Sequence, residues 1–286
     1  GRSWPASRMV VLDALAAQEP RRREAALLAL GEAEDGSTRD LLERGIGDAD
    51  PTVAAMAAWA VGQLEDAKSL PVLRRAVGHR DGRVQRAAIW ALGEIEDRRA
   101  TGWITPFLRD AEAATRRIAA RALGDIESRD AIDPLIAAGS DRDESVRVAV
   151  IEALGSIEDG RALGTLERAL DDPSIAVRRA AVEAIGDLDG LETAPPKLRQ
   201  LLSSEDVELR RGVARALSNI SDPAALPALA ARLGDPDLET RRAVVRAIGE
   251  IDHPDVARHL MRALEDADAE IRETAAEALG ERGKSD

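Results

Sequence analysis

RRAAVEAIGDL, residues 178–188, recurs in related form along the whole chain at an almost constant step. Every copy contains a triplet of two apolar residues followed by glycine, or in one copy by serine. The triplets end at Gly31, Gly62, Gly93, Gly124, Gly155, Gly186, Ser218, Gly249 and Gly280. Successive ends lie 31 residues apart, except that Ser218 follows Gly186 by 32. A period of this size is typical of a solenoid, so we predict a single repeat array over residues 1–286.

Each repeat carries the hydrophobic pattern of two amphipathic helices. An apolar residue stands 20 positions before the end of each triplet, and a second apolar position follows four residues later on the same helical face. Apolar residues also stand five, two and one positions before the last residue of the triplet and two positions after it, and they form the buried stripe of a second helix. Polar turns such as 47–51 and 171–173 separate the helices, where Asp can cap the incoming helix and Pro fits its first turn. The sequence predicts an all-α fold, an α-solenoid of nine two-helix repeats.

Small residues set how neighbouring repeats meet. Alanines on the second helices let backbones from adjacent repeats approach closely, and we expect each second helix to bend or end at the terminal glycine. The register slip falls in residues 189–196, which contain the only Pro-Pro pair of the chain. Gly212 and Ser218 replace an apolar residue and a glycine in the repeat that follows. We predict a softer joint or a change of superhelical curvature near 189–196, without a domain boundary.

One repeat shows the whole motif in order. An Asp-rich turn with a β-branched residue and arginine, 143–147, precedes Ala149 and the triplet 153–155. This pattern resembles the short HEAT repeats named after the phycocyanobilin lyase subunits. The resemblance implies that the second helices line a concave surface and that the arginine eight residues before the triplet end, the −8 row, pairs with turn aspartates. The −8 row comprises Arg23, Arg116, Arg147, Arg178, Arg210, Arg241 and Arg272.

Composition narrows the class of partner. The formal net charge is −13, from 40 Lys and Arg against 53 Asp and Glu, which disfavours nucleic acids and anionic membranes as partners. Only three of the basic residues are lysines, which suggests either a salt-adapted protein or a GC-rich genome. The chain has no cysteine and no apolar run long enough to span a membrane. We therefore expect a cytoplasmic protein.

Two further rows of the second helices are candidate binding residues. At 100° per residue, the position seven before the triplet end, the −7 row, points away from the buried stripe and is expected to be the most exposed. The position three before the end, the −3 row, lies beside it. Arginine can grip carboxylate or phosphate through two parallel hydrogen bonds, and tryptophan adds apolar anchorage. The candidate site is Trp59, Arg86, Trp90, Arg117, Arg121, Arg179, Arg211, Arg215, Arg242 and Arg246.

These rows suggest several functions. The leading hypothesis is a non-catalytic scaffold or adaptor that binds an acidic or phosphorylated protein segment in an arginine-rich concave groove. Alternatively, the arginines pair with Glu152, Glu183 or nearby acids on a solvated helix face. A lyase-like or chaperone-like accessory protein that binds a tetrapyrrole or a client is a second candidate function. Nucleic-acid binding, as in HEAT-fold DNA glycosylases, is a third, which the net charge of −13 opposes.

The sequence offers little support for catalysis. The three histidines, His79, His253 and His259, are not followed by glutamate, unlike the His-Glu pairs of the di-iron deoxyhypusine hydroxylases, which are also HEAT proteins. Neither a phosphate loop nor a nucleophile elbow is recognisable. We therefore predict no catalytic residue, no metal and no cofactor. Trp103 and Phe107, four residues apart on a first helix, are assigned to packing between repeats.

Overall fold

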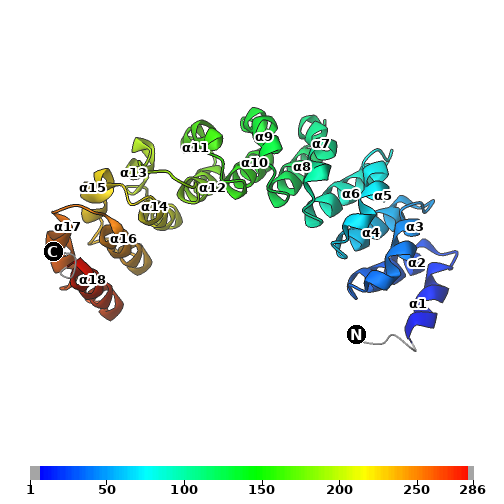
Figure 1. The fold of residues 1–286 in the computed structure, drawn as a ribbon, viewed down its shortest axis with the longest axis horizontal. Coiled ribbons are helices and arrows are strands. Elements are labelled where there is room, and N and C mark those ends of the chain that lie inside the picture. Colours follow the sequence, from blue (N-terminus) through cyan, green and yellow to red (C-terminus); the bar gives the residue numbers. More distant parts are fainter. Residues whose placement is uncertain (1–6, 283–286) are drawn as a thin grey trace. The chain divides into compact units, whose positions relative to one another are not determined.

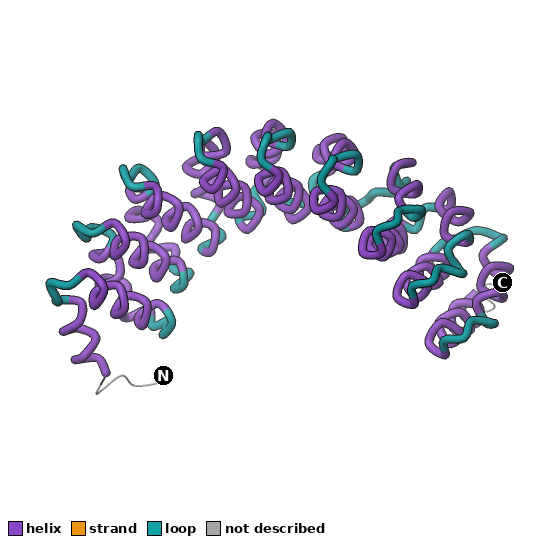
Figure 2. Tube along the Cα trace, turned by 180° about the vertical axis from the view of Figure 1, so that it is seen from behind, coloured by secondary structure: helices purple, strands orange, loops and turns teal. Residues whose placement is uncertain are grey.

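A computed structural model describes residues 7–282, and within that range every regular element is helical. The first helices of the repeats are α1 (Ser7–Leu15), α3 (Arg39–Gly45), α5 (Leu70–Ala76), α7 (Thr101–Ile104), α9 (Ile132–Ala138), α11 (Leu163–Ala169), α13 (Pro196–Leu201), α15 (Leu226–Ala230) and α17 (Val256–Ala263). The second helices are α2 (Pro20–Gly31), α4 (Pro51–Gly62), α6 (Gly82–Glu94), α8 (Ala113–Asp125), α10 (Glu144–Ser156), α12 (Ile175–Gly186), α14 (Val207–Ile220), α16 (Leu238–Glu250) and α18 (Ala269–Arg282). The predicted α-solenoid of two-helix repeats is confirmed, and Figure 2 shows the short loops that join the helices.

The chain divides into two compact units, residues 1–153 and 154–286, with the boundary inside α10. In the first unit α2, α4, α6 and α8 pack side by side, and in the second α12, α14, α16 and α18 do the same (Figure 1). The first helices cover the second helices of their own repeats, as α5 covers α6 and α11 covers α12. Each unit is therefore a two-layer stack of helix pairs.

The apolar residue 20 positions before each triplet end falls within the first helix and packs between these two layers. Leu42, Leu73, Leu135 and Leu229 are completely buried, as the sequence pattern predicts. Val11, in the first repeat, is only half-buried. The core is thus repeated along each unit rather than gathered at one centre, so every second helix keeps one face free of it.

Aspartates begin most second helices. The Asp50 carboxylate accepts a hydrogen bond from the Thr52 N–H at 2.8 Å, and Asp81 accepts one from the Arg83 N–H at 2.9 Å. Pro51 stands in the first turn, as predicted. Pro173 and Pro236 do not, because they precede the capping residue and lie outside the helix. Aspartate therefore recurs at this position more regularly than proline does in the first turn.

The triplet glycines permit close backbone contact between neighbouring repeats, and α2, α4 and α12 also end at this glycine, as expected. A Cβ placed on Gly93 would lie 2.8 Å from Ala122 Cα in the next repeat. The nearest alanine atom lies at 2.8–2.9 Å for the other glycines of this kind, Gly31, Gly62, Gly124, Gly155 and Gly186. Left-handed backbone instead occurs three residues later, at Glu34, Glu65, Glu96, Glu127 and Glu158. Only a residue without a side chain fits between these helices.

The register slip lengthens one loop. Repeats two to six open their first helix with a 3-10 turn, whereas the segment before α13 is irregular and contains Gly190 at φ 70°. The Asp222 carboxylate anchors this segment by accepting hydrogen bonds from the Ala194 N–H at 3.0 Å and from Arg199 at 2.8 Å. A softer joint at 189–196 stays a prediction.

Candidate interaction surface

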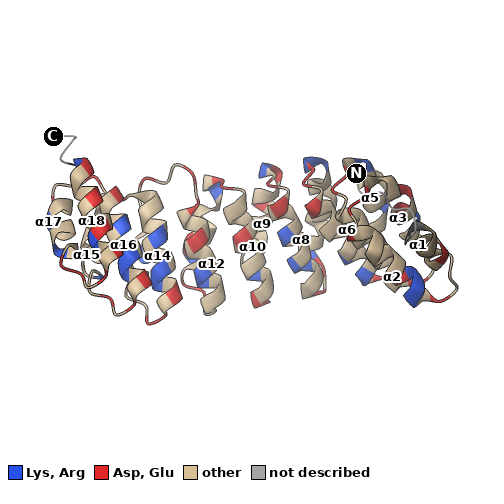
Figure 3. Cartoon of the chain, turned by 90° about the horizontal axis from the view of Figure 1, so that it is seen from below, with Lys and Arg blue, Asp and Glu red and all other residues tan. Residues whose placement is uncertain are grey.

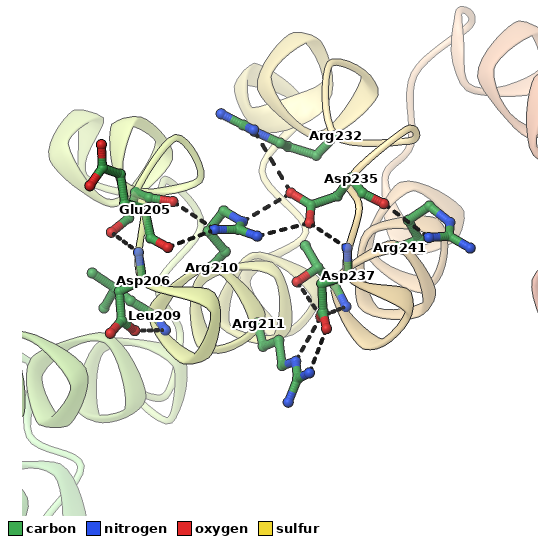
Figure 4. Close-up of polar contacts among 11 residues, drawn as sticks. Glu205, Asp206, Leu209, Arg210, Arg211, Arg232, Asp235, Asp237 and Arg241 are labelled. Carbon is green, nitrogen blue, oxygen red and sulfur yellow. Dashed lines mark hydrogen bonds and ion pairs between the residues drawn. The ribbon is translucent and has the colours of Figure 1, made fainter.

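The −8 arginines tie each repeat to the next. Arg116 donates from Nε and Nη2 to both carboxylate oxygens of Asp141, at 2.7 and 2.9 Å, and from Nη1 to the Asp110 carbonyl at 2.8 Å. Arg23, Arg210 and Arg241 make the same pair with an aspartate 25 residues later. Figure 4 shows the bond from Arg210 to Asp235, whose side chains are 8% and 0% exposed. The structural role implied by the family resemblance is confirmed.

The second repeat lacks both partners of this pair. Ala54 replaces the arginine of the second repeat, and His79, 25 residues later, replaces the aspartate. The His79 ring nitrogen Nδ1 takes over the local role of the carboxylate by accepting the Asp81 N–H at 3.0 Å. The second repeat has therefore lost the whole pair, whereas in the third repeat Gln85 replaces only the arginine and Asp110 remains. Arg178, in the repeat before the register slip, donates from Nη1 to the carbonyls of Asp172 and Pro173, at 2.6 and 3.1 Å.

Four of the five −7 arginines also bind acids of the next repeat, which contradicts the expectation that this row is the most exposed. Arg211 donates to both carboxylate oxygens of Asp237, at 2.7 and 2.6 Å, and so lowers the pKa of Asp237 below its usual range. Arg86 pairs with Glu112, Arg179 with Asp206, and Arg242 with Asp268. Three of the nine residues in this row are exposed, against seven in the −3 row. A helical wheel shows that the −7 row points away from the buried face of its own helix. It does not include the next second helix, and the acids that bind these arginines lie at the N-terminus of that helix.

The free arginines of the candidate site lie elsewhere. Arg215 and Arg246, in the −3 row of the second unit, are exposed and make no hydrogen bond or ion pair with any residue between 7 and 282. In the first unit, Arg117 and Arg121 are exposed and have no ion pair within the described chain. These four guanidinium groups can still bind an external anion.

Arg215 and Arg246 border a groove over α12, α14 and α16. Its larger part has a volume of about 500 Å³, and an adjoining part over α14 and α16 has about 300 Å³. Gly212 lines the larger part at a position where the neighbouring repeats carry alanine. Asn219, which the sequence analysis did not single out, also lines it and donates to the Gly186 carbonyl at 3.1 Å. The side chain missing at Gly212 helps to open the groove.

The groove is not an unbroken basic stripe. Glu183, Asp187 and Glu208 line its larger part together with the arginines, and Glu239 and Glu270 line the smaller part. Figure 3 shows acidic and basic residues side by side on α12, α14 and α16. Arginine and carboxylate therefore alternate along this surface.

The two tryptophans of the candidate site belong to the first unit and pack within it. The rings of Trp59 and Trp90 stack with centroids 6.2 Å apart and planes 15° from parallel. Each ring also covers the glycine of the preceding repeat, because a Cβ on Gly31 or Gly62 would lie 2.9 or 2.8 Å from it. Both side chains are half-buried. They contribute to repeat stacking as well as to the surface.

Comparison with known proteins gives the family. HEAT repeats match residues 8–93, 75–143, 101–176, 132–208, 164–243 and 229–286, which together span nearly the whole sequence. This chain belongs to the HEAT-repeat family. One of the matches, 132–208, runs across the boundary between the two compact units of this HEAT-repeat protein. No curated protein matches the chain.

Solved structures similar to this HEAT-repeat protein include the complex of CpcE and CpcF of phycocyanin lyase from Nostoc sp. PCC7120. That match has a TM-score of 0.51 and 21% identity over 85% of this chain and 94% of the other, which confirms the resemblance at the level of fold. An engineered protein matches with a TM-score of 0.44 and 19% identity, over 94% of this chain and 97% of that one. Human deoxyhypusine hydroxylase matches with a TM-score of 0.39 and 21% identity, over 85% and 95%.

The described part of this HEAT-repeat protein has neither the residue clusters of a metal site nor a membrane-spanning helix. Residues 7–282 contain no cluster of three or more His, Asp or Glu side chains arranged to hold a metal ion. Over the same range no helix is long and apolar enough to cross a membrane.

Proposed function

We propose that this HEAT-repeat protein is a non-catalytic scaffold that holds a protein partner in the groove over α12, α14 and α16. The partner segment carries carboxylate or phosphate groups, which Arg215 and Arg246 bind. The observation behind this proposal is that these two arginines line the groove without an internal partner, while Arg179, Arg211 and Arg242 beside them are held by acids. We infer a cytoplasmic location from the composition of the chain.

The ion pairs between repeats prepare the groove for binding. The forks of Arg210 and Arg211 fix α14 against the turn before α16, through Asp235 and Asp237 (Figure 4). A surface held in place before the partner arrives loses less entropy on association. The structural arginines thus support the two that remain free.

The acids in the groove select the partner. Glu183 and Glu208 would repel a continuous run of negative charge, which disfavours nucleic acid and polyanions. A peptide with single acidic or phosphorylated residues separated by neutral ones places each charge against one arginine. This alternation also makes the groove a poor site for a tetrapyrrole, whose ring system needs a continuous apolar wall.

A binding assay with defined peptides tests the proposal. The probes are fluorescein-labelled Gly-Ser peptides with two separated glutamates, or with two separated phosphoserines, and the readout is fluorescence anisotropy. The test variant is Arg215→Glu/Arg246→Glu. The control is Arg109→Glu/Arg142→Glu, which makes the same change in charge at two exposed arginines outside the groove. Circular dichroism checks that both variants keep the helicity of the wild type.

A hydrogen bond to a charged group contributes about 1.5–3 kcal/mol, so losing both arginines should weaken binding by roughly 100-fold or more. The control variant should bind within about twofold of the wild type. Equal affinities for all three proteins would show that the groove arginines are only a solvated face. Equal weakening in both variants would show that net charge alone attracts the peptide.

A further inference from the structure

A second cluster of free cations lies on the first helices of the first unit. An open hollow of about 840 Å³ is bordered by α5, by α7 and by the 3-10 turns before them. Its apolar floor is formed by Leu70, Pro71 and the ring of Trp103. Lys68, Arg74 and Arg75 stand around that floor. The groove over α12, α14 and α16 shares none of these residues.

Arg74 is held in place without being neutralised. Its guanidinium carbon lies 4.9 Å from the centroid of the Trp103 ring, so the cation rests against the aromatic face. This contact restricts the side chain but leaves its N–H donors free for other acceptors. None of the described residues provides an acceptor for them. Trp103 thus makes the predicted contact between repeats and also presents a fixed cation.

The two aspartates that precede the 3-10 turns of the hollow, Asp66 and Asp97, already pair with other arginines. Both oxygens of Asp97 accept hydrogen bonds from Arg99, at 2.9 and 2.6 Å, and this pairing lowers the pKa of Asp97 to about 2. Asp66 is bound by Arg39 at 2.8 Å. Neither acid is available to Lys68 or Arg75.

The three cations therefore lie together, and none of them forms an ion pair within the described chain, although the charge of Asp66 acts on Lys68. Lys68, Arg74 and Arg75 make no side-chain ion pair there, although acids outnumber bases in the whole protein by 53 to 40. Like charges placed together repel one another, and an anion that enters the hollow relieves that repulsion. The apolar floor in turn favours a ligand that also has an apolar group.

We propose that this hollow binds a short peptide segment in which an apolar side chain is flanked by carboxylates. The apolar side chain packs on Trp103, Leu70 and Pro71, and the carboxylates bind Arg74, Arg75 and Lys68. Free phosphate has no apolar group that could pack on the floor of the hollow. A nucleic acid would be repelled by the protein's net charge of −13. This site is additional to the groove, so either can exist without the other.

The test uses a short labelled peptide that alternates Glu with Leu and Phe. One control peptide has Gln in place of Glu, and another has Ser in place of Leu and Phe. Anisotropy is measured for the full chain, for Arg74→Glu/Arg75→Glu, for Trp103→Ala and for Trp103→Phe. The variant Arg215→Glu/Arg246→Glu reports on the groove separately, and a single-stranded RNA oligomer tests the competing class of ligand.

The alternating peptide should bind the wild type at least about tenfold more tightly than either control peptide. Arg74→Glu/Arg75→Glu and Trp103→Ala should each weaken it at least about tenfold, while Trp103→Phe, which keeps an aromatic face, should recover most of the affinity. The groove variant should bind it like the wild type.

Three results would overturn the inference. The first is no binding of the alternating peptide to the wild type, or binding equal to that of the Gln peptide. The second is unchanged binding in Arg74→Glu/Arg75→Glu with loss in Arg215→Glu/Arg246→Glu, which would place the peptide in the groove and leave the proposed function standing. The third is RNA that binds more tightly than the peptide and loses affinity on Arg74→Glu/Arg75→Glu.

Discussion

Replacement of Gly93 by alanine should destabilise the protein, although alanine is the better helix former. A Cβ at this position would lie 2.8 Å from Ala122 Cα, 2.9 Å from Ala122 Cβ and 3.2 Å from a carboxylate oxygen of Asp125. Carbon atoms prefer a separation of about 3.5–4.0 Å, so the overlap with the alanine is close to 1 Å. The Asp125 side chain can rotate away, but the Cα of Ala122 cannot. Relief therefore requires α6 and α8 to move apart.

The size of the effect follows from two opposing contributions. Forcing a methyl group into a packed contact costs about 1–3 kcal/mol, and more where backbone must move. Replacing glycine by alanine inside a helix gains up to about 1 kcal/mol, and less near the helix end, where Gly93 lies. We expect Gly93→Ala to lower the free energy of unfolding by about 1–2 kcal/mol. A shift of this size lowers the melting temperature by a few degrees.

Gly280 is the matched control because it ends the same Ala-Leu-Gly triplet in α18. A Cβ there would meet nothing within 4 Å, so Gly280→Ala should leave stability unchanged or raise it by up to about 1 kcal/mol. Urea unfolding followed by circular dichroism measures both variants. If Gly93→Ala proves as stable as the wild type, close backbone approach is not the reason for the glycine.

Four further predictions concern single side chains. Arg210→Ala leaves the fully buried Asp235 without its main partner and should cost about 3 kcal/mol or more in urea unfolding, whereas an unchanged midpoint would contradict the role of the pair. Arg116→Lys should lower the free energy of unfolding by most of the amount that Arg116→Ala does, because an ammonium group cannot bind a carboxylate and a backbone carbonyl through a planar fork. A lysine variant as stable as the wild type would contradict this explanation. Glu96→Gly should raise the melting temperature, since φ is 52° at this position and the relief is a few tenths to about 1 kcal/mol. The hydrogen bond from Arg83 lowers the pKa of Asp81 to about 2, so the contribution of this carboxylate to the free energy of unfolding is complete above pH 4 and is lost as the pH falls toward 2. Asp81→Asn should therefore make the free energy of unfolding fall less steeply between pH 4 and pH 2.

The fold could be predicted from the sequence because each repeat contacts only its neighbours. A period of 31 residues fixes which helix packs on which, and the apolar positions inside one period fix which face is buried. From α2 to α16, every second helix ends at the last residue of its triplet or at most two residues later. No long-range pairing had to be guessed.

The candidate site was harder to predict because exposure depends on the next repeat. Arg211 points outward on a helical wheel of α14 alone, but Asp237, 26 residues later, reaches it from the turn before α16. Spacing is not a sufficient signal, because Arg117 also stands 26 residues before an aspartate, Asp143, and forms no ion pair with it. Side-chain positions decide between the two cases.

The same geometry gives a physical reason for the preference for arginine over lysine. At the −8 position one side chain must bind both oxygens of an aspartate and a backbone carbonyl six residues earlier, as Arg210 does with Asp235 and the Ser204 carbonyl (Figure 4). Only a guanidinium group has donors in the directions that this requires. An arginine stands at this position in seven of the nine repeats, so a long array of this kind accumulates arginine. Most arginines on the second helices are therefore part of the framework, and a guanidinium group without an internal partner is the feature that marks a place for a ligand.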